Sequence, residues 1–331
     1  MAITPSCPMK LSCLRKTLSL GRRPWTVIVR AVVSILLLGF MVWWVSPGRL
    51  LSLWRDAEPV PLVGAFLLLL MAQVLSGYKW GLLLRTYQPT VGSVRAIRAY
   101  FIGMFFNTVL PWSYAGDGVR SYVATTEMGL PLRMSIATVV IDRLSGYLAL
   151  LLLGLLGLGF LYWPLPVVIA LAAVGAAGLI LGASLLPRYS SSIRALPGPA
   201  GQLLAERTLA VSLRQALPLA FVFHSAAILS LGLIIRGVGL HLPWAYIAVA
   251  ELVSSTASVV PLSLGGIGVR EFSLATVLTA HGASPEGATA VAFAYGLTFA
   301  ALGLLGGLVL PLREVALMRG SLTRMKAEET A

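Results

Sequence analysis

The feature that most constrains this 331-residue chain is a ten-residue motif that occurs twice inside strongly apolar sequence. Residues 111–120 read PWSYAGDGVR and residues 261–270 read PLSLGGIGVR, so both follow the pattern P-x-S-x-x-G-x-G-V-R, at an offset of 150 residues. Proline, glycine and arginine are all costly inside a membrane-spanning helix. Hydrophobic segments interrupted by glycine and proline at corresponding places in two halves are typical of a transport site in a membrane protein.

The composition places most of the chain in a membrane. Hydrophobic residues make up 58% of the sequence and charged residues only 11%, whereas a soluble domain carries roughly 25% charged residues. The net charge of +13 is expected to lie in cytoplasmic loops that face anionic lipid. Nucleic acid is not an expected partner, because no basic stretch lies on a soluble folded module. Since the chain contains no metal-binding or nucleotide-binding motif, we expect no metal and no cofactor.

Long apolar stretches predict a multi-pass protein. About 20 apolar residues cross a bilayer, and six stretches reach that length: 27–45, 60–84, 134–162, 165–186, 216–236 and 288–310. Basic residues gather in the N-terminal tail, after the second span, in the loop 187–215 and in the C-terminal tail. The positive-inside rule therefore puts both termini in the cytosol. We predict a basic cytoplasmic tail at 1–26, one membrane domain at 27–311 and a second cytoplasmic tail at 312–331.

Two shorter apolar stretches each stop at a proline. Residues 100–110 end at Pro111 and residues 246–260 end at Pro261. Eleven helical residues rise only ~16 Å, about half of the hydrocarbon core. A second short helical piece follows each break, at 119–128 and 269–281. We therefore predict two re-entrant hairpins, at about 100–130 and 246–281, although breaks that merely bend ordinary spanning helices remain an open alternative.

The order of these segments predicts an inverted repeat. Three spans separate the hairpins, so the hairpins should enter the membrane from opposite sides, with their tips meeting near the midplane. This is the layout of an alternating-access transporter. The predicted fold class is an all-α polytopic membrane protein, with about six full transmembrane helices and two re-entrant hairpins related by an inverted repeat.

Each predicted hairpin tip has the chemistry of an anion site. A helix N-terminus there presents free N–H groups and the positive end of a dipole, and glycines let a ligand approach the backbone closely. Arg120 and Arg270 add planar donors that match a phosphate. The competing interpretation is that an internal carboxylate neutralises each arginine, and both interpretations remain open.

Other polar residues inside apolar sequence extend the candidate site. Asp142 and Arg143 form either a structural ion pair or a gating pair in the third span. Asn107 either binds the ligand or forms hydrogen bonds with the broken backbone of its own hairpin. Asp117 is most simply explained as the cap of a helix that begins at Gly118. The predicted substrate-binding residues are Asn107, Ser113, Gly116, Asp117, Gly118, Arg120, Asp142, Arg143, Glu251, Ser263, Gly265, Gly266, Gly268, Arg270 and Glu271, with Pro111 and Pro261 as structural breaks. Glu251, Glu271 and Asp142 are also candidate proton carriers.

Five segments together resemble a known family. They are FFNTVLP (105–111), GDGVR (116–120), IDRLSGY (141–147), Glu251 and PLSLGGIGVRE (261–271). The chain is similar to the flippase-like integral membrane domain of the lysylphosphatidylglycerol synthases, or multiple peptide resistance proteins, in a stand-alone form without the synthase domain. It departs from that family at 112–115, where the family is richer in glycine, and at Ala257, which occupies the position matching Asn107.

The resemblance implies the movement of a phospholipid, or a related anionic or zwitterionic lipid, between leaflets of the bacterial cytoplasmic (inner) membrane. The expected partners are membrane lipids as substrate, a lipid-modifying enzyme and, from the basic loops, anionic lipid at the cytoplasmic face. On this reading the protein is not an enzyme.

Two other functions remain open. A membrane transferase acting on a polyprenyl-phosphate or glycolipid would need an acidic cluster in a loop, and the longest loop, 187–215, holds only Glu206. An accessory subunit of a lipid-synthesis complex would need no site at the hairpin tips.

Overall fold

The computed structural model describes residues 24–110, 115–164, 166–167, 207–260 and 262–310, and within these ranges it consists of α-helices and the turns between them. This confirms the all-α fold class. The helices are α2 (Pro24–Trp44), α3 (Pro47–Arg55), α4 (Pro59–Tyr87), α5 (Ser93–Val109), α6 (Ala115–Met128), α7 (Leu132–Tyr162), α10 (Arg207–Gly237), α11 (Trp244–Ala257), α12 (Val269–Ala280) and α13 (Pro285–Leu308).

Four of these helices are long and apolar enough to cross a membrane. They are α4, α7, the Ser212–Gly237 part of α10, and α13, and they match the spans predicted at 60–84, 134–162, 216–236 and 288–310. Helices α2 and α3 meet at an 87° bend and count as a fifth span if they are taken together. The predicted span at 165–186 lies almost wholly outside the described residues, as do residues 1–23 and 311–331, so the count of six spans remains a prediction.

The two interrupted stretches each form a pair of contacting helices, α5 with α6 and α11 with α12. Helix α11 has 14 residues, close to the expected length. Helix α5 begins at Ser93 rather than at residue 100 and has 17 residues, a rise of ~26 Å. Helix α6 begins at Ala115, four residues before the predicted start. Pro111, Ser113 and Pro261 lie outside the described residues.

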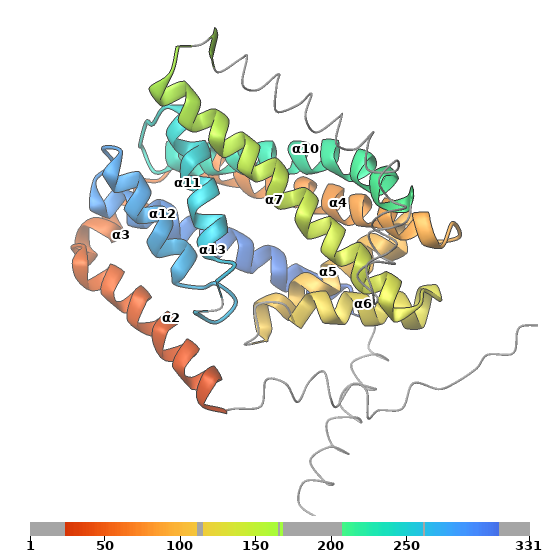
Figure 1. Ribbon diagram of the computed structural model, residues 1–331. Helices are drawn as coiled ribbons and strands as arrows, with labels where there is room; N and C mark the ends of the chain where they lie inside the picture. Colours follow the sequence, from red (N-terminus) through yellow and green to blue (C-terminus); the bar gives the residue numbers. More distant parts are fainter. Residues whose placement is uncertain (1–23, 111–114, 165, 168–206, 261, 311–331) are drawn as a thin grey trace, which may run out of the picture.

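The offset of 150 residues extends from the motif to four helices in each half. Adding 150 to the bounds of α4, α5, α6 and α7 gives 209–237, 243–259, 265–278 and 282–312, which overlap α10, α11, α12 and α13. The packing is reciprocal as well: α5 packs on α13 while α11 packs on α7, and α4 packs on α10. Reciprocal contacts of this kind are expected about a two-fold axis. In Figure 1 the α5–α6 pair and the α11–α12 pair lie at opposite sides of the bundle.

Apolar side chains cover both the inside and the outside of the bundle. One buried cluster joins α4 to α10, α11, α12 and α13, and a second joins α4 to α5, α6 and α7. Large apolar side chains are also exposed along the spans, among them Met71, Leu144, Leu297 and Leu304. Such a continuous exposed apolar surface fits contact with lipid rather than water.

Candidate functional site

A cavity of about 590 Å³ lies between the two hairpins. Both halves line it, and the tips of the hairpins touch: a Cβ atom added to Gly265 would lie 3.1 Å from the carbonyl oxygen of Asn107. Charged side chains are concentrated here, with four basic and four acidic residues on the cavity wall: Lys79, Arg120, Arg143, Arg270, Asp117, Asp142, Glu251 and Glu271. The structure therefore brings the predicted charged residues from both motifs to one place.

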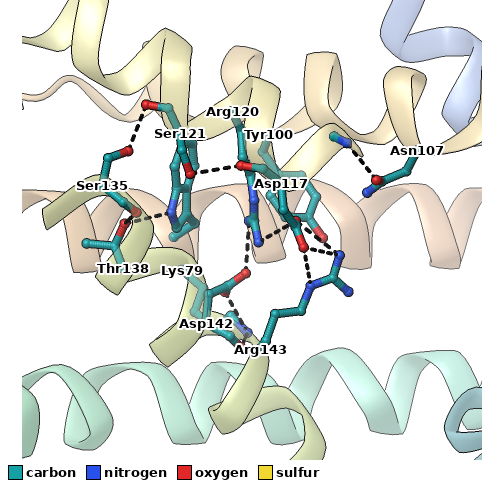
Figure 2. A network of polar contacts seen from close by, with 12 residues as sticks. Lys79, Tyr100, Asn107, Asp117, Arg120, Ser121, Ser135, Thr138, Asp142 and Arg143 are labelled. Carbon is teal, nitrogen blue, oxygen red and sulfur yellow. Dashed lines mark hydrogen bonds and ion pairs between the residues drawn. The ribbon is translucent and has the colours of Figure 1, made fainter. Parts of the chain in front are cut away.

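Arg120, of hairpin one, is the centre of a buried ion network (Figure 2). Its two terminal nitrogens lie 2.9 Å from Asp142 Oδ2 and 3.0 Å from Asp117 Oδ1. The rings of Trp80 and Tyr100 lie 5.1 and 5.4 Å from its guanidinium carbon, within cation–π range. Only 3% of the Arg120 side chain is exposed. Arg120 therefore has the internal carboxylate partners that the structural-pairing interpretation requires.

The network extends in both directions from Arg120. On one side, Lys79 Nζ lies 3.0 Å from Asp142 Oδ1. On the other, Arg143 donates from Nε and Nη2 to the two oxygens of Asp117 at 3.0 and 3.1 Å. This planar double contact is the strong form of an arginine–carboxylate pair. Arg143 remains 40% exposed and lines the cavity.

Two interpretations of these residues were wrong. Asp142 and Arg143 do not form an ion pair with each other, because each reaches a partner on another helix. Asp117 does not cap a helix that begins at Gly118. It is the third residue of α6, which begins at Ala115, and both of its carboxylate oxygens bind arginines.

Hairpin one is closed by a backbone approach between α5 and α6. The side-chain oxygen of Asn107 accepts a hydrogen bond from the Gly116 N–H at 2.8 Å, which satisfies a donor in the first turn of α6. A Cβ atom at Gly116 would collide with the backbone of Gly103. Asn107 thus serves the broken backbone while it also lines the cavity.

Hairpin two is organised around Glu271 instead of an ion network. The Gly268 N–H donates to Glu271 Oε2 at 2.6 Å, which caps α12. Arg270 is held more loosely than Arg120: it lies 3.4 Å from Glu271 Oε1, its guanidinium carbon lies 4.4 Å from the centre of the Phe299 ring, and 19% of its side chain is exposed. This arginine keeps donor groups on the cavity wall.

Glu251 of α11 is the acid on the cavity wall whose carboxylate is bound by hydroxyl groups. Its side chain accepts hydrogen bonds from the hydroxyls of Tyr295 at 2.9 Å and Ser255 at 2.8 Å. It is 2% exposed.

Helix α2 fastens the tip of hairpin two from outside the repeated halves. Ser34 Oγ accepts a hydrogen bond from the Leu264 N–H and donates one to the Ile267 carbonyl, both at 3.0 Å. Gly268, with φ +88°, lies directly against this helix, since a Cβ atom there would be 3.1 Å from the Ser34 carbonyl oxygen. Only glycine tolerates both that backbone angle and that approach.

Residues 27–307 match the family described as "Lysylphosphatidylglycerol synthase TM region". The chain belongs to this family. The resemblance that the motifs indicated is therefore confirmed, and the chain is a multi-pass membrane protein of that family.

Two curated proteins are similar to parts of the chain. A UPF0104 membrane protein from Methanothermobacter thermautotrophicus is 26% identical over 164 residues, which is 48% of this chain and 48% of that protein. "Glycosyltransferase AglD" from Haloferax volcanii is 26% identical over 142 residues, 40% of this chain and 22% of that protein. The matches thus span less than half of either relative. No solved structure matches the chain.

Only some of the glycines and serines predicted to bind substrate line the cavity. Gly265 lines it, whereas Gly118 is exposed outside it and Gly116 is packed against α5. Gly266 and Gly268 shape the hairpin tip through positive φ angles. Ser263 is fully buried, and its hydroxyl has no hydrogen-bond partner among the described residues.

Four residues at the site were not predicted from the sequence: Lys79, His224, Tyr295 and Ser34. Lys79 and His224 both line the cavity and both interrupt an apolar span, which is a signal that the rule for intramembrane ionisable residues would have found. Tyr295 and Ser34 carry no such signal, because their roles depend on contacts with distant helices.

Proposed function

We propose that the protein moves a lipid with an anionic or zwitterionic head group between the two leaflets by alternating access. The head group enters the cavity between the hairpin tips while the acyl chains stay in the surrounding lipid. The observation that carries this proposal is the cavity itself, whose charged lining comes from both interrupted helix pairs.

The cost of the charges supports a use for them. One charged side chain in a spanning helix costs about 2.5–3.5 kcal/mol even on insertion scales, and eight aspartate, glutamate, lysine and arginine residues line this cavity. Arg143 and Arg270 are more exposed than Arg120. We assign the head-group phosphate to these two arginines, and to Arg120 the role of holding hairpin one closed.

The repeated helix order and the reciprocal packing of α5 on α13 and α11 on α7 support two equivalent gates. The two halves are inverted if three spans separate the hairpins: α7, the predicted span at 165–186, and α10. Both termini then lie in the cytosol of a bacterial cell, with the protein in the cytoplasmic membrane, where anionic lipid meets the basic tails.

A membrane transferase is the second candidate, because one relative is named a glycosyltransferase. That match covers 22% of the relative. Transfer of a sugar from a nucleotide sugar to polyprenyl phosphate by the purified chain would establish this alternative. An accessory role in a lipid-synthesis complex would instead leave the purified chain without either activity.

The test is a leaflet assay in liposomes that contain fluorescent phosphatidylglycerol or a labelled polyprenyl phosphate. Wild type is compared with Arg270→Ala and with Arg49→Ala. Arg49 is a matched control, because its side chain is 76% exposed on α3 and does not line the cavity. We expect wild type and Arg49→Ala to move label between leaflets, and Arg270→Ala to be at least tenfold slower, which corresponds to about 1.4 kcal/mol.

Folded wild type that moves neither lipid would overturn translocation. Equal rates for Arg270→Ala and Arg49→Ala would leave translocation standing but would show that Arg270 of hairpin two does not bind the head group. Size-exclusion profiles of all three proteins establish that the comparison is between folded chains.

A further inference from the structure

Glu251 differs from the other three acids on the cavity wall in its partners. Asp117 and Asp142 each bind two cations, and Glu271 binds the Gly268 amide and lies next to Arg270. Glu251 is held by two neutral hydroxyls, those of Tyr295 and Ser255. Within the described part of the chain, no lysine, arginine or histidine nitrogen lies close enough to the Glu251 carboxylate to form an ion pair, for which the limit is 4.0 Å.

This environment suits a carboxyl group that gains and loses a proton. A buried carboxylate without a paired cation is costly, by several kcal/mol, and gaining a proton removes that cost. The Tyr295 and Ser255 hydroxyls can donate to either protonation state, so the site retains its geometry when the charge changes. Ionisable groups inside a membrane protein commonly form proton relays, and Glu251 lines the cavity through which such a proton would arrive.

The helices that pack against α11 each carry charged or titratable groups on the cavity wall. They are Arg270 and Glu271 of α12, Asp142, Arg143 and Tyr147 of α7, and His224 of α10. Tyr295 of α13 bonds to Glu251 directly, and Lys79, Tyr100, Asp117 and Arg120 line the same cavity from α4, α5 and α6. Among them, Arg270 lies on the wall of the same cavity as Glu251 and is also the arginine that we assign to the head group.

We propose that Glu251 takes up one proton when an anionic lipid head group binds at Arg270, so that lipid and proton cross the membrane together. This inference rests on the proposed translocation. While the cavity is empty, the positive charge of Arg270 favours the Glu251 carboxylate. A bound phosphate neutralises Arg270, and a proton from the cavity water then binds a Glu251 oxygen. Release of the lipid on the other side reverses the step, and by linkage the proton strengthens lipid binding by the same factor.

The stoichiometry makes the prediction quantitative. One anionic lipid with one proton carries no net charge, so transport should respond to a pH gradient and not to a membrane potential. A gradient of one pH unit is worth about 1.36 kcal/mol per proton. At one proton per lipid, labelled phosphatidylglycerol should therefore accumulate ~tenfold in the leaflet that faces the alkaline side.

The experiment uses full-length protein in phosphatidylcholine liposomes with fluorescent phosphatidylglycerol, under either a pH gradient or a potassium diffusion potential. Wild type is compared with Glu251→Gln and with Glu58→Gln. Glu58 is a matched carboxyl control, because it is exposed, its side chain forms no cap hydrogen bond and it does not line the cavity. We expect the ~tenfold asymmetry in wild type and Glu58→Gln, and a ratio near one in Glu251→Gln under the pH gradient. In Glu251→Gln the label should instead follow the membrane potential.

Each outcome separates the two claims. Wild type that moves label but reaches the same leaflet ratio with and without the pH gradient would overturn proton coupling and leave translocation standing. Wild type that moves no label would overturn translocation and the coupling with it. Because Glu251→Gln changes a buried residue and can also affect folding, Tyr295→Phe is a second variant that keeps the carboxyl group. It removes one donor from the carboxylate, so the pH dependence of the transport rate should shift to higher pH, and an unchanged profile would contradict the assignment.

Discussion

The two hairpins share a motif but hold its arginine in opposite ways. Arg120 is nearly inaccessible, fixed by two carboxylates and two aromatic rings, whereas Arg270 lies beside one carboxylate and over one ring, with part of its side chain open. A repeated sequence thus produces a fully paired, buried arginine in one half and a loosely paired, partly exposed arginine in the other.

The reason lies outside the motif. At the offset of 150 residues, three members of the ion network around Arg120 are replaced by apolar side chains: Asp117 by Ile267, Asp142 by Ala292, and Lys79 by Leu229. The halves retain the broken backbone and one arginine, while the ion network belongs to hairpin one alone. A motif that is repeated in sequence therefore does not transfer a residue's role from one half to the other.

The largest expected effect that separates the halves follows the loss of Asp142. Asp142→Asn leaves Lys79 and Arg120 buried without their shared counter-charge, which should lower the free energy of unfolding by about 3–5 kcal/mol. Glu271→Gln in hairpin two removes mainly a helix cap and should cost about 0.5–2 kcal/mol. Denaturant-induced unfolding in detergent micelles measures both, and equal losses would end the distinction between the hairpins.

The next effect is a backbone collision specific to hairpin one. Gly116→Ala places a methyl group in the backbone of Gly103, so α5 and α6 must separate, at a cost of about 1–3 kcal/mol or more. Gly118→Ala is the matched control two residues away, where a Cβ atom meets nothing within 4 Å. That substitution should stabilise the helix by up to about 1 kcal/mol. Similar melting temperatures for the two variants would disprove the close approach.

Hairpin two should be loosened by a change on a different helix. Ser34→Ala removes both hydrogen bonds between α2 and the tip, at about 1 kcal/mol each. Hydrogen exchange of residues 262–268 should become faster, while exchange in α6 stays the same. Ser52→Ala is a control, since the Ser52 hydroxyl donates to the Arg49 carbonyl of its own helix, α3. No change in exchange at the tip would show that α2 does not hold it.

The smallest effect is the reciprocal one in hairpin one. Asn107→Ala removes the bond to the Gly116 amide and should cost about 1 kcal/mol. Hydrogen exchange should increase in the first turn of α6 and not at the tip of hairpin two. An increase at both tips would indicate that the hairpins open as one unit.

Length and apolarity were sufficient to predict α4, α7, α10 and α13, because a spanning helix is defined by those two properties. They failed at the start of α5, where Arg95 and Arg98 end the apolar run while the helix continues along a more polar surface and Arg98 binds Glu127 at 2.9 Å. The charged composition of the site was largely predicted. Its pairings were not, since Lys79 reaches Asp142 across 63 residues of chain, and such contacts are decided by packing.

The Ser34 hydrogen bonds connect the tip of hairpin two, which forms part of the cavity wall, to helix α2 at the outside of the bundle. Helix α2 exposes Ile35, Leu36 and other apolar side chains along much of its length, and it packs on the bundle mainly through α12. Any excursion of the tip of hairpin two must therefore either break two hydrogen bonds or displace a helix that is embedded in lipid. Under the proposed lipid transport, the membrane that supplies the lipid would also resist movement of this hairpin tip, and a tilt of α2 in a thinner or thicker bilayer would be transmitted to the backbone at Leu264 and Ile267.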